Sequence, residues 1–165
     1  MSGLNHYKEV IIRLATELDY DGYYHIKCDS QNIVWGGFDK APEYSKFREV
    51  FLNRLNSPNR REYVCEVDYS IVGYLAAIEE DDVVEISYGV LAEASGKGVA
   101  TALIKNVSSE YPNKDVIAWV SENNKGSERC LIKNGFVKQN KFETRYLSLT
   151  ATDHKFYKWE RKSAF

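Results

Sequence analysis

Two glycines lie where an extended, apolar segment gives way to a helical pattern. Gly96 and Gly98 follow residues 83–90, which are rich in β-favouring side chains, and precede residues 99–111, whose apolar side chains recur at helical spacing. A glycine pair at a helix start lets the backbone approach a ligand closely, and the first-turn N–H groups lack intrahelical partners. Because these groups attract anions, the sequence predicts a turn that binds phosphate or pyrophosphate.

Two common nucleotide-binding patterns do not fit this turn. The Walker pattern needs four residues between its first glycine and a Gly-Lys pair, but Gly89 stands too far from Gly96 and Lys97. The dinucleotide pattern needs glycine or alanine where Thr101 stands, and no acidic ribose ligand is evident near Asp115. Nucleotide binding is therefore the disfavoured alternative.

The glycine turn and a second motif together resemble the GCN5-related N-acetyltransferase (GNAT) family. The acetyl-CoA signature of that family is Gln or Arg, two residues, Gly, one residue, then Gly or Ala; Gly98 and Ala100 match it, and Ser95 departs from it. Residues 118–136, which read AWVSENNKGSERCLIKNGF, are similar to the family's block of strand, Asn-x-x-Ser/Ala, helix and Lys-x-Gly-Phe. In the residues of the strand and the glycine turn, the chain looks closest to the branch that acetylates ribosomal-protein N-termini.

The resemblance implies acetyl-CoA as co-substrate and a set of residues that bind it. The main chain of residues 88–90, in a strand with a backbone irregularity beside a splayed neighbour, is expected to face the pantetheine arm and the oxyanion. Amides from the glycine turn are expected to hold the pyrophosphate, with Lys97 either contacting phosphate or solvated. Asn124 is expected to contact the pantetheine or acetyl region, and it also suits a helix N-cap. The expected acetyl-CoA-binding residues are Tyr88, Gly89, Val90, Gly96, Lys97, Gly98, Val99, Ala100, Thr101 and Asn124.

Acyl transfer from a thioester to an amine needs a base, an oxyanion site and a proton for the departing thiolate. Some relatives carry a glutamate in the strand before the Asn-x-x-Ser block, but residues 118–120 contain no carboxylate, so Glu85 is the candidate base. An exposed strand carboxylate without a catalytic role is equally consistent with this residue. Many relatives carry a tyrosine seven residues after the Asn, where this chain has Leu131. Ser127 shares a helix face with Asn124 and is the candidate acid, although a first-turn serine can simply satisfy the backbone.

The acceptor is expected to be a primary amine, either a protein N-terminal α-amine or an amine on a small molecule. In the resembled family the region corresponding to residues 19–60 shapes the acceptor site, and here it contributes Tyr24, Trp35 and Phe38, for which core packing is the alternative. A weak base favours an α-amine, whose pKa is about 7.7 to 8, over a lysine amine at about 10.4. The alternative function is a non-catalytic acyl-CoA-binding or sensor module.

The order of the periodic segments predicts an α/β (α+β) fold with a mixed sheet of six to seven strands and about four helices. A right-handed βαβ unit, residues 83–120, is expected at its centre, with its second strand buried on both faces. Helices are expected to begin at Asp19 and Pro42, with an irregular connector over residues 30–38. The other strands are expected within residues 10–15, 63–67, 71–78, 136–138, 144–149 and 156–159.

Composition bounds the class of protein. The 165 residues fit a single domain, residues 1–165, with an acetyl-CoA-binding core at about residues 83–140. A hydrophobic fraction of 44% without a long apolar run predicts no membrane association, and the net charge of −2 gives no basic field for nucleic acid. Three widely spaced cysteines and three scattered histidines predict no disulfide and no metal site. We expect a cytoplasmic protein, because the N-terminus lacks the features of a secretory signal. We also expect a monomer or a homodimer.

Overall fold

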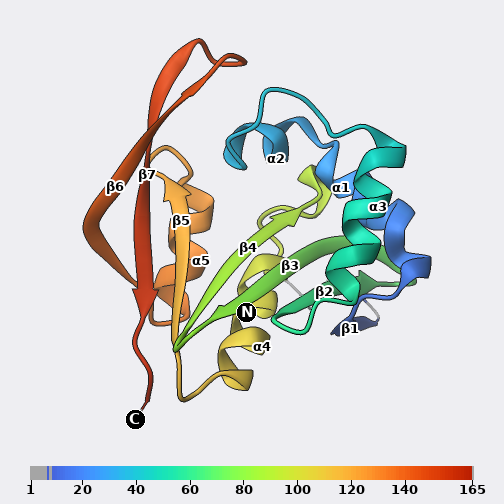
Figure 1. Ribbon diagram of the computed structural model, residues 1–165, viewed down its shortest axis with the longest axis horizontal. Coiled ribbons are helices and arrows are strands. Elements are labelled where there is room, and N and C mark those ends of the chain that lie inside the picture. The colour runs from blue at the N-terminus through green and yellow to red at the C-terminus, as the bar shows by residue number, and fades with distance from the viewer. Residues whose placement is uncertain (1–6, 8, 165) are drawn as a thin grey trace.

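A single mixed sheet runs through the computed structural model, which describes residues 7 and 9–164. Within these residues seven strands lie in the order β1-β2-β3-β4-β5-β7-β6, and α4 connects the parallel pair β4 and β5 (Figure 1). The strands are β1 (Val10–Leu14), β2 (Arg60–Val67), β3 (Ser70–Glu80), β4 (Val83–Val90), β5 (Asp115–Ser121), β6 (Val137–Leu147) and β7 (Thr152–Arg161). The helices are α1 (Tyr20–Lys27), α2 (Ser30–Trp35), α3 (Tyr44–Leu55), α4 (Val99–Glu110) and α5 (Lys125–Lys133), with short 3₁₀ turns at η2 (Glu17–Asp19) and η3 (Ala92–Ala94). The predicted mixed α/β fold with a central βαβ unit is confirmed.

The helices cover both faces of the sheet. A Cβ atom at Gly73 of β3 would lie 2.8 Å from Val99 of α4, whereas the ring of the next residue, Tyr74, stacks 4.5 Å from Tyr23 of α1. Neighbouring residues of a strand point to opposite faces, so α4 and α1 pack on opposite sides. The hydrophobic core therefore has two layers, one on each face of the sheet. On the face covered by α1, four buried aromatic side chains from α1 and α3 pack together: Tyr20, Tyr23, Phe47 and Phe51.

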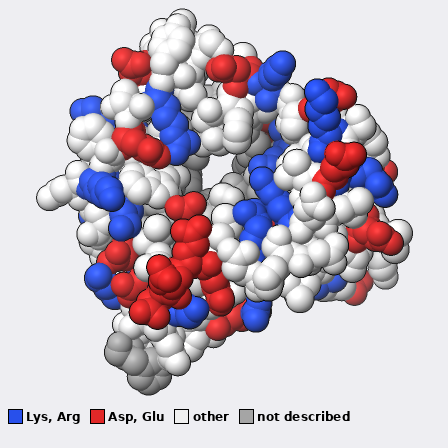
Figure 2. All heavy atoms as spheres, viewed as in Figure 1, with Lys and Arg blue, Asp and Glu red and all other residues white. Residues whose placement is uncertain are grey.

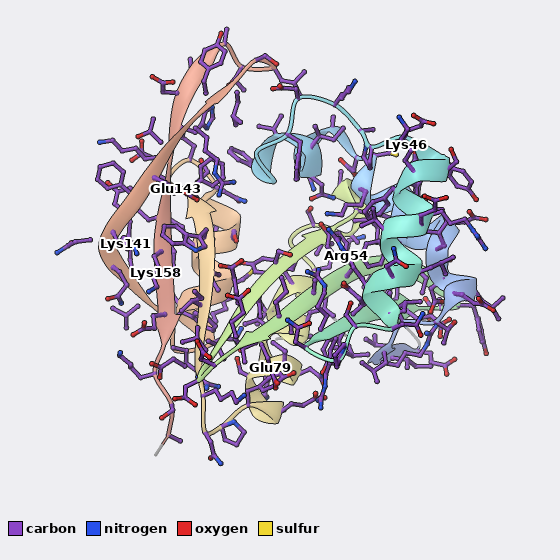
Figure 3. All side chains as sticks on the ribbon, in the orientation of Figure 1. Lys46, Arg54, Glu79, Lys141, Glu143 and Lys158 are labelled. Carbon is purple, nitrogen blue, oxygen red and sulfur yellow. The ribbon has the colours of Figure 1, made fainter. Side chains whose placement is uncertain are left out.

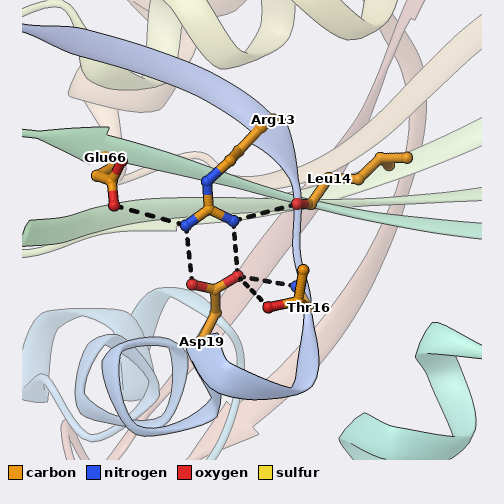
Figure 4. A network of polar contacts seen from close by, with 5 residues as sticks. All are labelled: Arg13, Leu14, Thr16, Asp19 and Glu66. Atoms are coloured by element: carbon orange, nitrogen blue, oxygen red, sulfur yellow. Dashed lines mark hydrogen bonds and ion pairs between the residues drawn. The ribbon is translucent and has the colours of Figure 1, made fainter. Parts of the chain in front are cut away.

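A network of hydrogen bonds connects β1 to the start of α1 (Figure 4). The guanidinium of Arg13 donates to both carboxylate oxygens of Asp19, at 2.7 and 2.9 Å, and the N–H of Thr16 donates to the same carboxylate at 2.8 Å. Hydrogen bonds from Arg13 hold the pKa of this buried carboxyl below its usual value. The pair fixes the direction in which the chain leaves β1 and places α1 over the sheet.

The predicted irregular connector at residues 30–38 is partly wrong, because its first six residues form the helix α2. Asp29 caps this helix by accepting a hydrogen bond from the N–H of Gln31 at 3.2 Å. Three α-helices, not two, therefore lie between the first two strands of the described chain. A six-residue helix is too short to show a repeating apolar face, so only its capping residue signalled it.

Two expectations about the central strands are also corrected. β5 alternates between buried and half-buried residues, so it is not buried on both faces as predicted. β4 pairs with β3 in unbroken register from Val83 to Val90, so the expected backbone irregularity is absent on that side. At the C-terminus, the three short predicted segments merge into the long hairpin of β6 and β7.

Candidate active site

β4 and β5 separate near their middle. They pair in parallel at Val83–Asp115, Val84–Val116 and Glu85–Ile117. Beyond these pairs, β4 runs on to Val90 and β5 to Ser121, and the two strands no longer pair with each other. The edge of β4 that faces β5 is therefore open after Glu85. This is the splay expected from the sequence, and it leaves main-chain groups along residues 86–90 without a partner on β5. The Val90 carbonyl is bonded to α2 instead, and the others are open to an extended ligand.

A cavity of ≈ 1400 Å³ occupies this separation. It extends from the start of α4 across the open edge of β4 to α2 and α3. Nine of the ten predicted acetyl-CoA-binding residues line it: Tyr88, Gly89, Val90, Gly96, Gly98, Val99, Ala100, Thr101 and Asn124. Lys97 is not part of this lining, and its ammonium lies 5.8 Å from the ring centroid of Tyr7.

The glycine turn leaves the start of α4 open to a ligand. Gly98 is the N-cap of α4 and has a φ of 85°, a left-handed conformation in which glycine is not strained. Gly96 has a φ of 77°, and a Cβ atom there would meet no heavy atom within 4 Å. The first-turn N–H groups of this 12-residue helix have no intrahelical acceptors and carry the positive end of its dipole. The turn therefore fits a phosphate group.

Asn124 and Ser127 begin α5 beside the open edge of β4. The Asn124 side chain accepts a hydrogen bond from the Ser127 N–H at 3.2 Å, which confirms Asn124 as a helix N-cap. The hydroxyl of Ser127 lies 2.5 Å from the phenol oxygen of Tyr88, and burial raises the pKa of this phenol well above its usual value. The phenol is thus protonated at neutral pH. Leu131 is fully buried and does not line the cavity.

Glu85 stands at the point where the two strands part. It pairs with Ile78 of β3, which pairs in turn with Arg60 of β2, so all three side chains project from the same face of the sheet into the cavity. Glu85 is exposed, and among the described residues it forms no hydrogen bond or ion pair through its side chain. Its carboxylate is therefore accessible to a ligand in the cavity.

One wall of the cavity is formed by residues of α1, α2 and α3, within the region predicted to shape the acceptor site, and is called the acceptor side below. Its helix α2 is tied to the end of β4. The amide of Asn32 donates to the carbonyl of Val90 at 2.9 Å, and that of Gln31 donates to the same oxygen at 3.3 Å and to Ser95 Oγ at 3.1 Å. These bonds satisfy the strand end that β5 leaves unpaired. They also place the α2 segment beside the glycine turn.

The three predicted acceptor residues do not lie together. Trp35 and Phe38 line the cavity, as expected. Tyr24 does not; its hydroxyl donates to the Pro42 carbonyl at 2.7 Å, and its ring meets that of Tyr44 edge to face, with the centroids 5.0 Å apart. Tyr24 is therefore part of the packing between α1 and α3.

Sequence reasoning missed several residues of the cavity. It assigned Tyr88 a main-chain role only, whereas the Tyr88 side chain crosses from β4 to α5. It also missed Lys27 and Arg54, which line the acceptor side. Lys27 and Arg54 stand at the C-terminal ends of helices, where basic residues are common, so their types and positions gave no signal.

Other site classes find no support among the residues that the structure describes. None of the described helices is long and apolar enough to cross a membrane. In the same part of the chain, no group of three or more His, Cys, Asp or Glu side chains is arranged to hold a metal ion.

Comparison with known proteins identifies relatives of this fold. The model of the acetyltransferase (GNAT) family matches residues 22–136. No curated protein sequence matches the chain. Among solved structures, the chain is similar to spermidine N-acetyltransferase from Vibrio cholerae in complex with CoA and spermine, with a TM-score of 0.82, 14% identity, and coverage of 94% of this chain and 96% of that one.

Two further structures show the same likeness. One is a ribosomal-protein-alanine N-acetyltransferase from Brucella melitensis, with a TM-score of 0.81 and 18% identity over 92% of this chain and 99% of that one. The other is a phosphinothricin acetyltransferase from Sinorhizobium meliloti in complex with AcCoA, with a TM-score of 0.80 and 18% identity over 93% of this chain and 88% of that one. At these identities the likeness establishes the fold.

Proposed function

Because this chain belongs to the acetyltransferase (GNAT) family, we propose that it transfers the acetyl group of acetyl-CoA directly to a primary amine within a ternary complex. The acceptor amine is borne by a small molecule or by a protein N-terminus. The observation that carries the proposal is the separation of β4 from β5 after Glu85, because it joins an anion-binding turn, free main-chain groups and an unpaired carboxylate in one cavity.

The thioester enters along the open edge of β4. Main-chain groups of residues 88–90 bind the pantetheine arm and the oxyanion, and the first turn of α4 binds the pyrophosphate. Asn124 has its carbonyl oxygen engaged in capping α5, so its NH₂ group is the part available to the ligand.

The chemistry needs one proton to leave the amine and one to reach the sulfur. The amine nitrogen attacks the thioester carbon, the carbonyl electrons move to oxygen, and the collapse of this intermediate breaks the C–S bond. Glu85 takes the proton from nitrogen, directly or through water, and the hydroxyl pair of Ser127 and Tyr88 supplies the proton that the thiolate takes. Water then returns a proton to the hydroxyl pair, and Glu85 releases its proton to solvent. The products are an amide and CoA with a free thiol.

The hydroxyl pair bears on the alternative of a non-catalytic sensor. That alternative depends on Leu131 at the position where many relatives carry tyrosine. Tyr88 brings a phenol to Ser127 from a different element, so a proton donor is present without a tyrosine on α5. The pair therefore favours catalysis over binding alone.

A panel of amines tests the proposal. The protein is incubated with acetyl-CoA and each amine, release of CoA thiol is followed, and the acetylated product is identified by mass spectrometry. We expect transfer to at least one class of primary amine. The variant Glu85→Gln serves as a control, in which the rate of transfer should be lower. Tight CoA binding in calorimetry without transfer to any amine would instead support the sensor module.

A further inference from the structure

Two cations on the acceptor side of the cavity have no carboxylate partner. Lys27, in the last turn of α1, and Arg54, in the last turn of α3, are half-buried and line the cavity. Their charged groups lie 5.8 and 5.7 Å from the ring centroid of Phe47, and neither side chain forms an ion pair among the described residues. Partial burial of a cation costs free energy, which the faces of aromatic rings offset only in part. A bound anion would complete this arrangement.

The other charged side chains on this side have partners within the chain or lie at its surface. Arg60 pairs with the buried carboxylate of Glu62 at 3.2 Å, and Lys46 pairs with Glu43 at 3.3 Å. Asp39 accepts hydrogen bonds from Ser148 and lies, exposed, next to exposed Lys40. The unmatched charge of the interior wall therefore belongs to Lys27 and Arg54.

The views of the molecule agree with this distribution. Figure 2 shows an opening in the middle of the face, with Lys and Arg side chains on the wall beside α3 and side chains of both charges on the opposite wall, where Asp and Glu gather below the opening. Figure 3 shows Arg54 extending from α3 toward the sheet, whereas Lys46 lies at the outer end of the same helix. The side chain of Lys46 is 80% exposed. One helix thus carries a basic residue directed inward and another directed to solvent.

Lys27 also lies close to the open edge of β4. Its ammonium is 4.9 Å from the ring centroid of Tyr74, and a Cβ atom at Gly89 would lie 2.7 Å from the same ring. One aromatic ring therefore separates this cation from the main chain that faces the thioester. An anion bound by Lys27 would be held near Gly89, on the same face of β4 as the carboxylate of Glu85 four residues earlier.

We propose, on the basis of the function proposed above, that the acceptor carries an anionic group as well as its amine. Lys27 and Arg54 bind this group, which has the chemistry of a carboxylate, and Glu85 receives the amine. A free amino acid and a peptide N-terminus followed by acidic residues both have this chemistry. Polycationic amines are poor acceptors, because the two unpaired cations repel them.

Matched acceptors test the proposal by changing the charge near the amine. Phenylalanine is compared with phenylalaninamide, and the peptide Ala-Glu-Glu-Phe-amide with Ala-Lys-Lys-Phe-amide, by kcat/KM at saturating acetyl-CoA. We expect the anionic member of at least one pair to be favoured tenfold or more. The first pair identifies a free amino acid as the source of the anion, and the second pair identifies an acidic N-terminus. Equal rates within both pairs, or preference for the cationic members, overturn the proposal.

Variants locate the preference. Lys27→Gln and Arg54→Gln should each raise KM for the favoured anionic acceptor fivefold or more and change KM for its uncharged or cationic partner less than twofold. Arg48→Gln, on the same helix as Arg54, removes the charge of an exposed residue that does not line the cavity and should leave the preference unchanged. A preference that survives in the double variant of Lys27 and Arg54 assigns the anion to other residues and overturns the proposal.

A binding measurement separates this inference from the proposed function. The CoA complex is titrated calorimetrically with N-acetylphenylalanine and its amide, and with the N-acetylated forms of the two peptides, none of which needs turnover to bind. Tighter binding of the anionic ligands that is lost in Lys27→Gln and Arg54→Gln supports the anion site even if no amine is acetylated. Transfer to amines with no charge preference in rate or binding leaves the acetyltransferase in place and overturns the anion site.

Discussion

The phenol oxygen of Tyr88 lies 2.5 Å from the hydroxyl oxygen of Ser127, although Tyr88 belongs to β4 and Ser127 to α5. This contact joins the two sides of the cavity at the point where the strands have separated. It also brings a phenol to the start of α5, whereas the residue on that helix at which many relatives carry tyrosine is the fully buried Leu131. The proton donor that we propose therefore draws on two elements instead of one helix.

Removing either hydroxyl should slow the chemical step. We expect Ser127→Ala to lower kcat by about tenfold or more, because proton transfer to a leaving group contributes factors of this order or larger. Tyr88→Phe should lower kcat by a similar factor, and the double variant should be no slower than the slower single variant, since the two hydroxyls act as one unit. Steady-state kinetics give these values, and calorimetry should find acetyl-CoA affinity unchanged. Additive losses would show that the two groups act independently.

Glu85 provides a separate test of the base. Glu85→Gln keeps the shape of the side chain and removes its basicity, so kcat should fall by a factor of roughly 10² to 10⁴ while acetyl-CoA affinity stays the same. The exposed Asp82, in the turn just before β4, provides a control carboxylate. Asp82→Asn should have wild-type kinetics. Full activity in Glu85→Gln would assign the proton to water or to another carboxylate.

The glycine turn can be tested with a control for backbone strain. Gly98 and Gly135 both have a positive φ, of 85° and 82°, so alanine at either position should cost about 1 to 2 kcal/mol of stability. Gly98 lines the cavity and Gly135 does not. We expect Gly98→Ala to weaken CoA binding tenfold or more, and Gly135→Ala to keep wild-type affinity in calorimetry. Equal affinities for the two variants would contradict the placement of the phosphate at this turn.

Comparison of sequence and structure shows which features depend on local pattern. The strand, glycine turn and helix around Gly98 were predictable because each step has a local signal: β-favouring residues, a glycine pair and helical spacing. The contact between Tyr88 and Ser127 was not, because it depends on how far β5 turns away from β4. The short helix after Asp29 gave only a capping signal.

The cavity charges illustrate the same limit. Lys27 and Arg54 are common residue types for the last turns of helices, and only the packing of α1 and α3 around Phe47 brings them to one wall. By contrast, Glu85 could be named as the candidate base from the sequence, because residues 118–120 contain no carboxylate and alternation along one strand indicates which residues share its face. The side chains beside Glu85 on the neighbouring strands could not be predicted, because they depend on the register of β2, β3 and β4.

The last prediction concerns stability at low pH and the pair formed by Arg13 and Asp19. Hydrogen bonds from Arg13 lower the pKa of the Asp19 carboxyl in the folded protein, with a further contribution from Thr16. The unfolded chain, with an aspartate pKa of about 3.9, therefore binds a proton before the folded one does. The stability that the pair contributes is present above this value and is lost as pH falls through the lower folded pKa.

Replacing Asp19 should remove this contribution to the loss of stability at low pH. We expect Asp19→Asn to lower the free energy of unfolding by about 1 to 3 kcal/mol at neutral pH, because it leaves Arg13 without its main acceptor and breaks bonds to a buried charged group. Between pH 5 and 2 the difference between wild type and variant should shrink, since protonated wild-type Asp19 also loses the pair. Urea unfolding at a series of pH values measures both effects, with Asp82→Asn as the exposed control. A difference that stays constant down to pH 2 would show that Asp19 stabilises the fold through its shape and neutral hydrogen bonds and not through its charge.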